Sequence, residues 1–330
     1  MKLLKLTNYG LYCPAGDFYI DASGKVARNI VTHAHSDHAR PGHISYLTHT
    51  HSATLLRARM GKNICLQTLE YQQEINLNGV RVSLHPAGHI YGAAQVKIKH
   101  NGATWVVSGD YKLENDQLST PFEPVKCQVF VSESTFALPV YKWLQQKEVY
   151  DQINLWWQQN KAEGITSLLF GYSLGKSQRI IKNIDHSIGK VYVHKTVGAM
   201  NDAIRHSGAN LPATITLDES TRAQEVRGHL IIAPPSITAG RIMQDLHPVS
   251  IAMASGWAHT GKHMVRSNMD KGFVLSDHAD WPGINRAIEE SGANHVISMH
   301  GYTAELSQWL NETGLDSMEL EQLKYRHTAL

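Results

Sequence analysis

Cysteine is scarce in this chain: only three of its 330 residues are cysteines, and they lie far apart, at Cys13, Cys65 and Cys127. This spacing argues against a disulfide framework and lacks the pairing found in cysteine-rich structural zinc sites. We therefore expect a protein of the reducing cytoplasm. The hydrophobic content of 42% supports a sizeable core, in two domains or in one elaborated domain.

An excess of charge of one sign is also missing, since 31 Lys and Arg residues stand against 29 Asp and Glu residues, a net charge of +2. A nucleic-acid site must therefore be a local basic surface rather than a global one. Long apolar runs are missing as well. The opening segment MKLLKLTNYGLYC is short and interrupted by Lys5, Thr7 and Asn8. We expect neither a signal peptide nor a membrane span there, and no membrane partner.

Histidine, in contrast, is abundant, with 20 residues, and its densest group follows an apolar run that ends at Val31. Residues that alternate along a strand face the same way, so His33 and His35 point at one position. Asp37 and His38 follow where the loop bends back and reach a second position. This pattern is typical of a two-metal hydrolase, in which the ions lie about 3.5–4 Å apart. A polar loop with chance histidines explains the pattern far less well.

Further metal-ligand candidates stand at the ends of other apolar segments. His89 follows Gly88, which allows a sharp turn, and this turn favours His89 over the alternative ligand His85. Asp110 follows a buried strand, where its carboxylate can bridge two cations. His300 follows a third apolar strand.

Short strands and turns dominate the first part of the chain, and a helix is expected at 52–59. The strands are expected at 17–21, 29–32, 80–85, 95–99, 104–108 and 128–132. A long helix over 142–163 then carries Trp156 and Trp157, which we interpret as core residues rather than a base-stacking surface.

Strands alternate with helices after 163, which predicts a parallel sheet covered by helices. The expected strands are 166–171, 190–194, 229–233 and 250–255, and the expected helices are 176–184 and 199–206. The last part is expected to contain strands 272–276 and 295–299 and helices 281–291 and 303–312. Its strands also end near histidines, so we expect it to rejoin the first domain. The predicted organisation is 1–137 and 266–330 as one domain, with 138–265 inserted.

The ligand pattern of 33–38, together with His89, Asp110 and His300, resembles the metallo-β-lactamase superfamily. Glu133, His278 and His300 resemble the three additional motifs of its β-CASP nuclease branch. The resemblance implies an α/β fold, an αββα sandwich into which an α/β cap domain is inserted. Segments 10–13, 170–179 and 272–283 further resemble the bacterial ligase-associated DNA exonucleases. In one respect the chain departs from the eukaryotic DNA-specific members, because His300 is typical of the RNA-processing members.

The resemblance also implies roles for these residues. One divalent metal ion would be held by His33, His35 and His89, a second by Asp37, His38 and His300, and Asp110 would bridge the two. His278 would assist the leaving oxygen while Glu133 orients its ring. Asp21 would brace the ligand loop. The histidine-rich site favours zinc, with manganese as the alternative.

The segment 172–179 opens a predicted helix, and backbone N–H groups at a helix N-terminus bind anions. Together with the resemblance, this predicts that Tyr172, Ser173, Lys176, Gln178 and Arg179 bind the substrate, with Lys176 and Arg179 on its phosphates. The alternative is an ordinary solvated helix start.

Taken together, these features favour a metal-dependent DNA exonuclease of the β-CASP type. It would digest single strands or duplex ends in the 5′→3′ direction, in repair, beside an ATP-dependent DNA ligase and a helicase. An RNA-processing nuclease is the first alternative. A small-molecule hydrolase such as a thioesterase or lactonase is the second, and the predicted cap, Glu133 and His278 speak against it. A non-catalytic scaffold is disfavoured because no ligand position is degraded.

Overall fold

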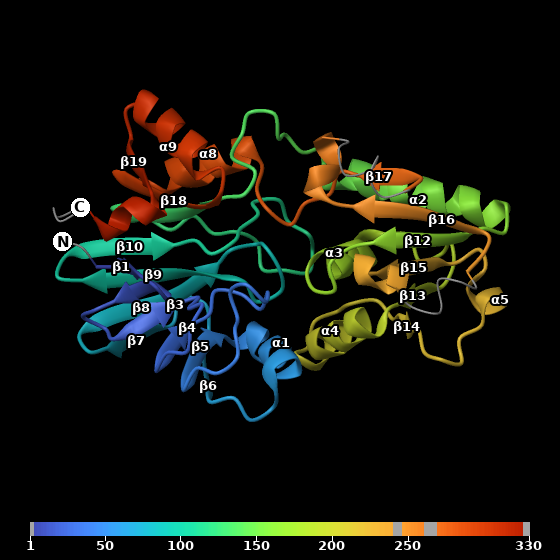
Figure 1. Ribbon diagram of the computed structural model, residues 1–330, viewed down its shortest axis with the longest axis horizontal. Helices are drawn as coiled ribbons and strands as arrows, with labels where there is room; N and C mark the ends of the chain where they lie inside the picture. Colours follow the sequence, from blue (N-terminus) through green and yellow to red (C-terminus); the bar gives the residue numbers. More distant parts are fainter. Residues whose placement is uncertain (1–2, 240–245, 261–268, 326–330) are drawn as a thin grey trace. The chain divides into compact units, whose positions relative to one another are not determined.

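The computed structural model describes residues 3–239, 246–260 and 269–325. The chain divides into two compact units (Figure 1). Unit 1 comprises 1–115, 119–142 and 278–330, and unit 2 comprises 116–118 and 143–277. The sequence-based boundary at 137/138 lies shortly before the division at 142/143. The boundary expected at 265/266 lies outside the described residues.

The first sheet of unit 1 has six strands in chain order. They are β1 Lys5–Thr7, β2 Gly10–Cys13, β3 Phe18–Ile20, β4 Arg28–Ile30, β5 Ser45–His49 and β6 Leu66–Leu69. The first three strands are antiparallel neighbours, and the strands from β3 to β6 run parallel. Helix α1, Thr50–Met60, packs against β5 and β6.

The second sheet of unit 1 has seven strands in the order β19-β18-β11-β10-β9-β8-β7. Their bounds are β7 Glu74–Leu77, β8 Val80–Pro86, β9 Ala94–His100, β10 Ala103–Val107, β11 Val129–Ser134, β18 His295–Gly301 and β19 Asp316–Glu319. Helix α8, Trp281–Ser291, packs against β11, and α9, Thr303–Glu312, packs against β18 and β19. The short 3₁₀ turn η3, Leu320–Lys324, follows β19.

One hydrophobic core joins the two sheets of unit 1. Ile30 and Leu47 come from the first sheet, and Val107, Val131 and Ile297 come from the second; all are buried in the same cluster. Helices α1, α8 and α9 pack on strands of the two sheets, so unit 1 has the expected αββα arrangement. Strand β18 pairs in parallel with β11, which lies far away in the sequence. The C-terminal segment thus contributes strands to the sheet that carries the candidate site.

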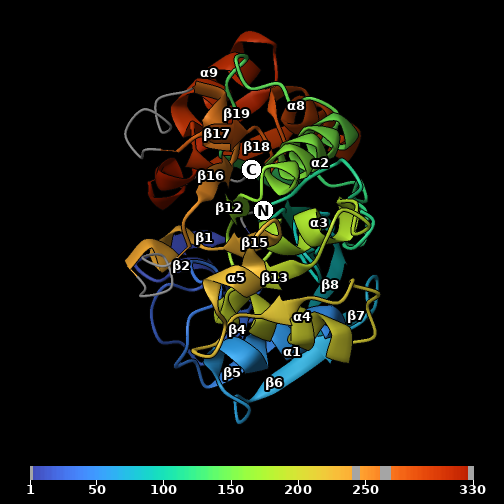
Figure 2. The same cartoon turned by 90° about the vertical axis from the view of Figure 1, so that its right-hand side faces the viewer.

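Unit 2 contains a fully parallel sheet in the order β14-β13-β15-β12-β16-β17, as the alternation of strands and helices predicted. The strands are β12 Thr166–Phe170, β13 Val191–Val193, β14 Ile215–Thr216, β15 Leu230–Ala233, β16 Val249–Ala254 and β17 Lys271–Phe273. The helices are α2 Gln146–Ala162, α3 Lys176–Asn183, α4 Lys195–His206 and α5 Ala223–Val226, with 3₁₀ turns η1 Pro235–Ala239 and η2 Gly256–Thr260. Helices α2, α3 and α4 lie side by side in Figure 2.

The long helix of unit 2 confirms the interpretation of its tryptophans, since Trp156 is 5% exposed and Trp157 is fully buried. Two predicted helix starts were displaced. Helix α2 begins at Gln146 instead of 142, and α4 begins at Lys195 instead of 199, because the side chain of His194 accepts a hydrogen bond from the Thr196 N–H and caps it. Within the described part of the chain, no helix combines the length and apolar character needed to span a membrane.

Candidate metal centre

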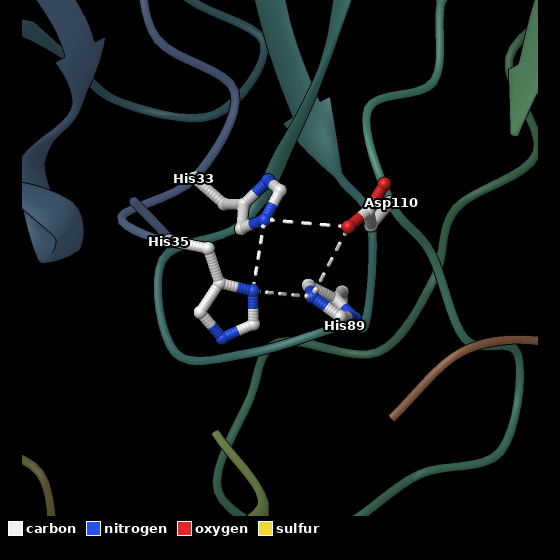
Figure 3. A group of neighbouring side chains, drawn as sticks. All are labelled: His33, His35, His89 and Asp110. Carbon is white, nitrogen blue, oxygen red and sulfur yellow. Dashed lines mark hydrogen bonds and ion pairs between the residues drawn. The ribbon is translucent and has the colours of Figure 1, made fainter. Parts of the chain in front are cut away.

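Four ligand atoms of unit 1 converge on one point, as Figure 3 shows. His33 and His35 lie in the loop after β4, His89 lies after β8, and Asp110 lies after β10. The Nδ1 atom of His35 lies 3.1 Å from Nε2 of His33 and 3.1 Å from Nε2 of His89. The Oδ2 atom of Asp110 lies 3.5 Å from Nε2 of His33 and 3.7 Å from Nε2 of His89. Ligand atoms of tetrahedral zinc lie about 3.3 Å apart, so this group fits such an ion.

The protonation states of this group also suit a cation. Burial, reinforced by the neighbouring His38, holds the pKa of His33 well below its usual value, so its ring stays neutral. Burial by itself would raise the pKa of Asp110, but the nearby rings of His38 and His278 outweigh that effect and hold it well below its usual value. A neutral imidazole nitrogen, as at His33, and an ionised carboxylate, as at Asp110, are ligands that suit zinc.

A second group shares the same carboxylate. Ligand atoms of His38, Asp110 and His300 all lie within 4.8 Å of one another. The Nε2 atom of His38 lies 3.5 Å from Oδ2 of Asp110 and 3.7 Å from Oδ2 of Asp37. The structure therefore brings six of the seven predicted metal ligands together in two groups that share Asp110, while Asp37 lies beside His38 and is 71% exposed. Their assignment as ligands stays a prediction.

Asp21, directly after β3, contacts His38 of the second group. Its Oδ2 atom accepts a hydrogen bond from Thr32 Oγ1 at 2.6 Å and lies 2.7 Å from Nδ1 of His38, while its Oδ1 atom accepts the Thr32 N–H. Burial alone would lower the pKa of His38, but the carboxylates of Asp110 and Asp21 together raise it well above its usual value. The contact with Nδ1 leaves Nε2 facing Asp110, which is the geometry that the predicted bracing role requires.

Two glycines allow the backbone to present these ligands. Gly88 has φ of 70°, and a Cβ atom there would lie 2.1 Å from the Lys112 carbonyl oxygen, so only glycine fits before His89. Strand β18 bulges at His300, because Met299 pairs with Glu133 while Gly301 pairs with Ser134. A Cβ atom at Gly301 would lie 2.5 Å from the Ser134 oxygen. The bulge and the following glycine change the direction in which the side chain of His300 leaves the strand.

A buried acid–histidine pair lies beside the first group. Glu133, at the end of β11, is fully buried and accepts hydrogen bonds from the Tyr111 N–H at 2.6 Å and from Thr135 Oγ1 at 2.7 Å. Its Oε2 atom lies 2.7 Å from Nδ1 of His278. The ring of His278 lies 4.7 Å from that of His89, measured between centroids. The contact through Nδ1 orients the ring of His278, as the prediction that Glu133 orients it requires.

The predicted substrate-binding residues separate into two sets. Tyr172 is 59% exposed, and Ser173 is partly exposed and bonds with Thr196 Oγ1. Gln178, in contrast, is 1% exposed, and its amide reaches the Gly175 N–H, the Ser173 carbonyl and the side chain of Asn201. It is therefore a capping residue of α3 in this structure.

Lys176 and Arg179, which were predicted to meet the substrate phosphates, are not exposed in this structure, and their contact with phosphate stays a prediction. They are 3% and 1% exposed, and both are ion-paired within unit 2. The alternative of a solvated helix start is wrong, because the whole first turn of α3 is buried. Sequence analysis placed these cations on the surface because their partners, Asp116 and Asp277, come from distant segments.

Sequence analysis also missed the donors that hold Glu133. Thr135 stood in the same segment as Glu133, so its hydroxyl was a detectable signal. The Tyr111 N–H was not, because a backbone donor leaves no trace in the sequence. Asp277 directly precedes His278 and could have been noticed for that reason.

Comparison with known proteins found no family model that matches. Over 312 residues, the chain is 31% identical to a protein named probable DNA ligase from Opitutus terrae, covering 94% of this chain and 30% of that protein. It is 22% identical to cleavage and polyadenylation specificity factor 73 of Drosophila melanogaster, covering 93% of this chain and 53% of that protein. It is 23% identical to endoribonuclease YSH1 of Candida albicans, covering 61% of this chain and 25% of that protein. The chain thus spans about half or less of each of these relatives.

Among solved structures, a protein of unknown function from Enterococcus faecalis superimposes with a TM-score of 0.62 over 88% of this chain and 78% of that one. Its 12% identity shows a likeness of fold alone. The chain belongs to the metallo-β-lactamase superfamily, in its β-CASP nuclease branch.

Proposed function

We propose that this protein is a metal-dependent DNA exonuclease that digests DNA from 5′ ends during repair. The observation that carries the hydrolytic part is the shared Oδ2 atom of Asp110, which faces ligand nitrogens of both groups. The preference for DNA is supported by the similarity of nearly the whole chain to a stretch of the probable DNA ligase. An ATP-dependent DNA ligase and a helicase would be its partners.

In this proposal, one ion would be held by His33, His35 and His89 and the second by Asp37, His38 and His300, with Asp110 available to both groups. Bound divalent ions of this kind lower the pKa of water to about 7 and polarise the phosphate oxygens. Zinc is the native metal we propose, and manganese is the alternative to be tested.

The protein groups then complete the hydrolysis. Asp110 would orient the attacking water, which releases one proton to solvent as its oxygen bonds to phosphorus, and the bond between phosphorus and the leaving sugar oxygen breaks. His278 Nε2 gives a proton to that oxygen, so the products are a phosphate monoester and a free hydroxyl. Glu133 accepts the Nδ1–H of His278 and stabilises the charged ring, as the carboxylate does in an Asp–His pair.

An RNA-processing nuclease is the second candidate, and two observations favour it. His300 lies in the second ligand group, as the RNA-processing resemblance implies. Two relatives also carry RNA-processing names, the polyadenylation factor and the endoribonuclease. The reaction at phosphorus would be the same, so only the substrate distinguishes the two candidates.

Matched DNA and RNA strands, each labelled at either end, test the proposal with purified protein in a zinc and manganese series. We expect mononucleotide or short products from the 5′ end of DNA, and none from a closed circular single strand, which offers no end. Asp110→Asn is the control for contaminating nucleases. Digestion of RNA alone would establish the second candidate, and cutting of the circle would show an endonuclease.

The cytoplasmic location is part of the same proposal. It is supported by the three cysteines, which are all free thiols, two of them buried. A repair nuclease that works beside a ligase on bacterial DNA would act in that compartment.

A further inference from the structure

Five side chains of unit 2 form a buried, fully compensated set, which we call the Asp277 cluster: Lys176, Arg179, Asp116, Asp277 and Gln146. The guanidinium of Arg179 lies at its centre. Its Nε atom lies 3.2 Å from Oδ1 of Asp277, its Nη2 atom 3.2 Å from Oδ2 of Asp116, and its Nη1 atom donates to Oε1 of Gln146 at 2.6 Å. Lys176 Nζ lies 3.4 Å from Oδ2 of Asp277.

The charges of this cluster balance. Lys176 and Arg179 supply the cations, Asp116 and Asp277 supply the anions, and no side chain of these is more than 4% exposed. A balanced, buried set offers no net positive charge to a nucleic-acid phosphate. Burial of each ion also costs several kcal/mol before pairing, so such a set is weak evidence for stability. We therefore ask what its fixed geometry accomplishes.

Asp277 contacts both cations of the cluster. Each of its carboxylate oxygens faces a different buried cation, Oδ1 toward Arg179 and Oδ2 toward Lys176. Such two-sided contact restricts the side-chain torsions of Asp277 and hence its backbone. Asp277 is joined by a peptide bond to His278, whose ring contacts Glu133.

Three residues of the cluster stand, in the sequence, at or near the boundaries of unit 2. Asp277 is the last residue of that unit, and Asp116 opens its short 116–118 segment. Gln146 stands at the start of α2, close to the division at 142/143. The guanidinium of Arg179 therefore binds the side chains of three residues near these boundaries, Asp116, Asp277 and Gln146.

We propose that Lys176 and Arg179 are positioning residues for His278, acting through Asp277. They hold the backbone that precedes His278, so that its Nδ1 atom stays within reach of Glu133 and its Nε2 atom keeps its direction. This inference rests on the role proposed above for His278. It replaces direct phosphate binding as the function of these two cations.

Asp277→Asn tests the inference, because the variant keeps the shape of the side chain and removes its charge. We expect kcat to fall about 10–100-fold, the range found when partners that orient site residues are removed. KM and metal content should stay as in the parent. In a His278→Ala background the same change should have no further effect, because the residue acts through His278. Equal losses in both backgrounds would overturn the proposal.

A second variant separates positioning from folding. Asp277→Asn combined with Lys176→Met restores the balance of buried charge without restoring the anchor. We expect the melting temperature to recover and kcat to stay low. Recovery of both would mean that Asp277 matters only for stability. Asp151→Asn, which removes one carboxylate of an exposed ion pair on α2, is the matched control and should leave kcat unchanged.

Nitrogen-15 NMR of histidine-labelled protein provides a readout that does not require activity. In the parent, His278 should show the tautomer with its proton on Nδ1, and His278→Ala identifies its signal. Asp277→Asn should shift His278 toward a mixture of tautomers. An unchanged His278 signal would overturn the inference. Failure of the parent to digest any nucleic acid would instead overturn the proposed function, which keeps the two outcomes distinct.

Discussion

The Nδ1 atom of His38 lies 2.7 Å from Oδ2 of Asp21, so the ring of His38 has only Nε2 left for the second ligand group. Asp21 additionally binds both the hydroxyl and the N–H of Thr32, the residue before His33. One carboxylate thus defines the orientation of a candidate ligand and the start of the loop that carries the others.

Asp21→Ala should therefore weaken binding of the metal at the second group about 10–100-fold, as expected when a ligand loses the partner that orients it. The measurement is a calorimetric titration of the metal-free protein with the metal ion. Asp17→Ala is the control, since Asp17 lies in the same sheet region and its side chain accepts a hydrogen bond from the hydroxyl of Tyr12. Equal metal affinities for both variants would contradict the bracing role.

Asp110→Asn should abolish nuclease activity while the chain remains folded. The amide has no charge and cannot serve both ligand groups, so at least one ion should be lost. Product formation, metal content and thermal melting are measured on the same preparation. Near-normal turnover by a folded variant would remove Asp110 from the mechanism.

His278→Ala should lower turnover about 10²–10⁴-fold, the usual contribution of a general acid or base, without loss of metal. The ring engages Glu133 through Nδ1, so we expect it to act on the leaving oxygen rather than as a ligand. Elemental analysis decides between these roles. Loss of one equivalent of metal in the variant would identify His278 as a ligand.

Thr135→Val should lower turnover about tenfold, because the buried carboxylate of Glu133 loses one of its donors. Valine matches the shape of threonine, so packing is retained. Thr135→Ser restores the hydroxyl and should restore most of the rate. If serine and valine variants behaved alike, the hydroxyl would have no part in holding Glu133.

His49 gives a prediction for acid stability. Burial, with a smaller effect of His51, lowers the pKa of His49 to about 3 in the folded protein, below its ordinary value. The unfolded chain therefore binds more protons below pH 6.5, and folding stability falls as the pH drops from there toward 3.

His49→Asn removes this titration and keeps an acceptor for the N-terminus of α1, where His49 caps the His51 N–H. Denaturant unfolding gives the free energy of unfolding at each pH between 7 and 5. This free energy should fall less steeply with decreasing pH in the variant than in the parent, and the two slopes should differ by at most about 1.4 kcal/mol per pH unit. The control His206→Asn, at an exposed position, should follow the parent. Parallel curves for all three proteins would refute the prediction.

The convergence of the candidate ligands could be predicted because these residues stand in one short segment and at strand ends. His33 and His35 alternate on a strand, and Asp110 and His300 follow apolar runs, so their convergence followed from the fold that the motifs implied. The parallel sheet of unit 2 was predicted for a similar reason, since its strands and helices alternate at regular spacing.

Burial of charge could not be predicted in the same way. Lys176 and Arg179 follow a glycine at a helix start, a pattern that suits anions, and only the tertiary structure shows which anions they meet. Short strands such as β6 and β19 were also missed, because they have too few residues for a period-two pattern to stand out. The bulge at His300 likewise depends on pairing with β11 rather than on local sequence.

The pairing of β18 with β11 has a consequence for synthesis of the protein. Unit 2 ends at residue 277, so all of its strands have been translated before either His278 or His300 exists. In the second sheet of unit 1, the edge of β11 meanwhile lacks its pairing strand until β18 emerges from the ribosome. In the proposed mechanism, a nascent chain therefore lacks both the proton donor His278 and the ligand His300 until all of unit 2 has been translated.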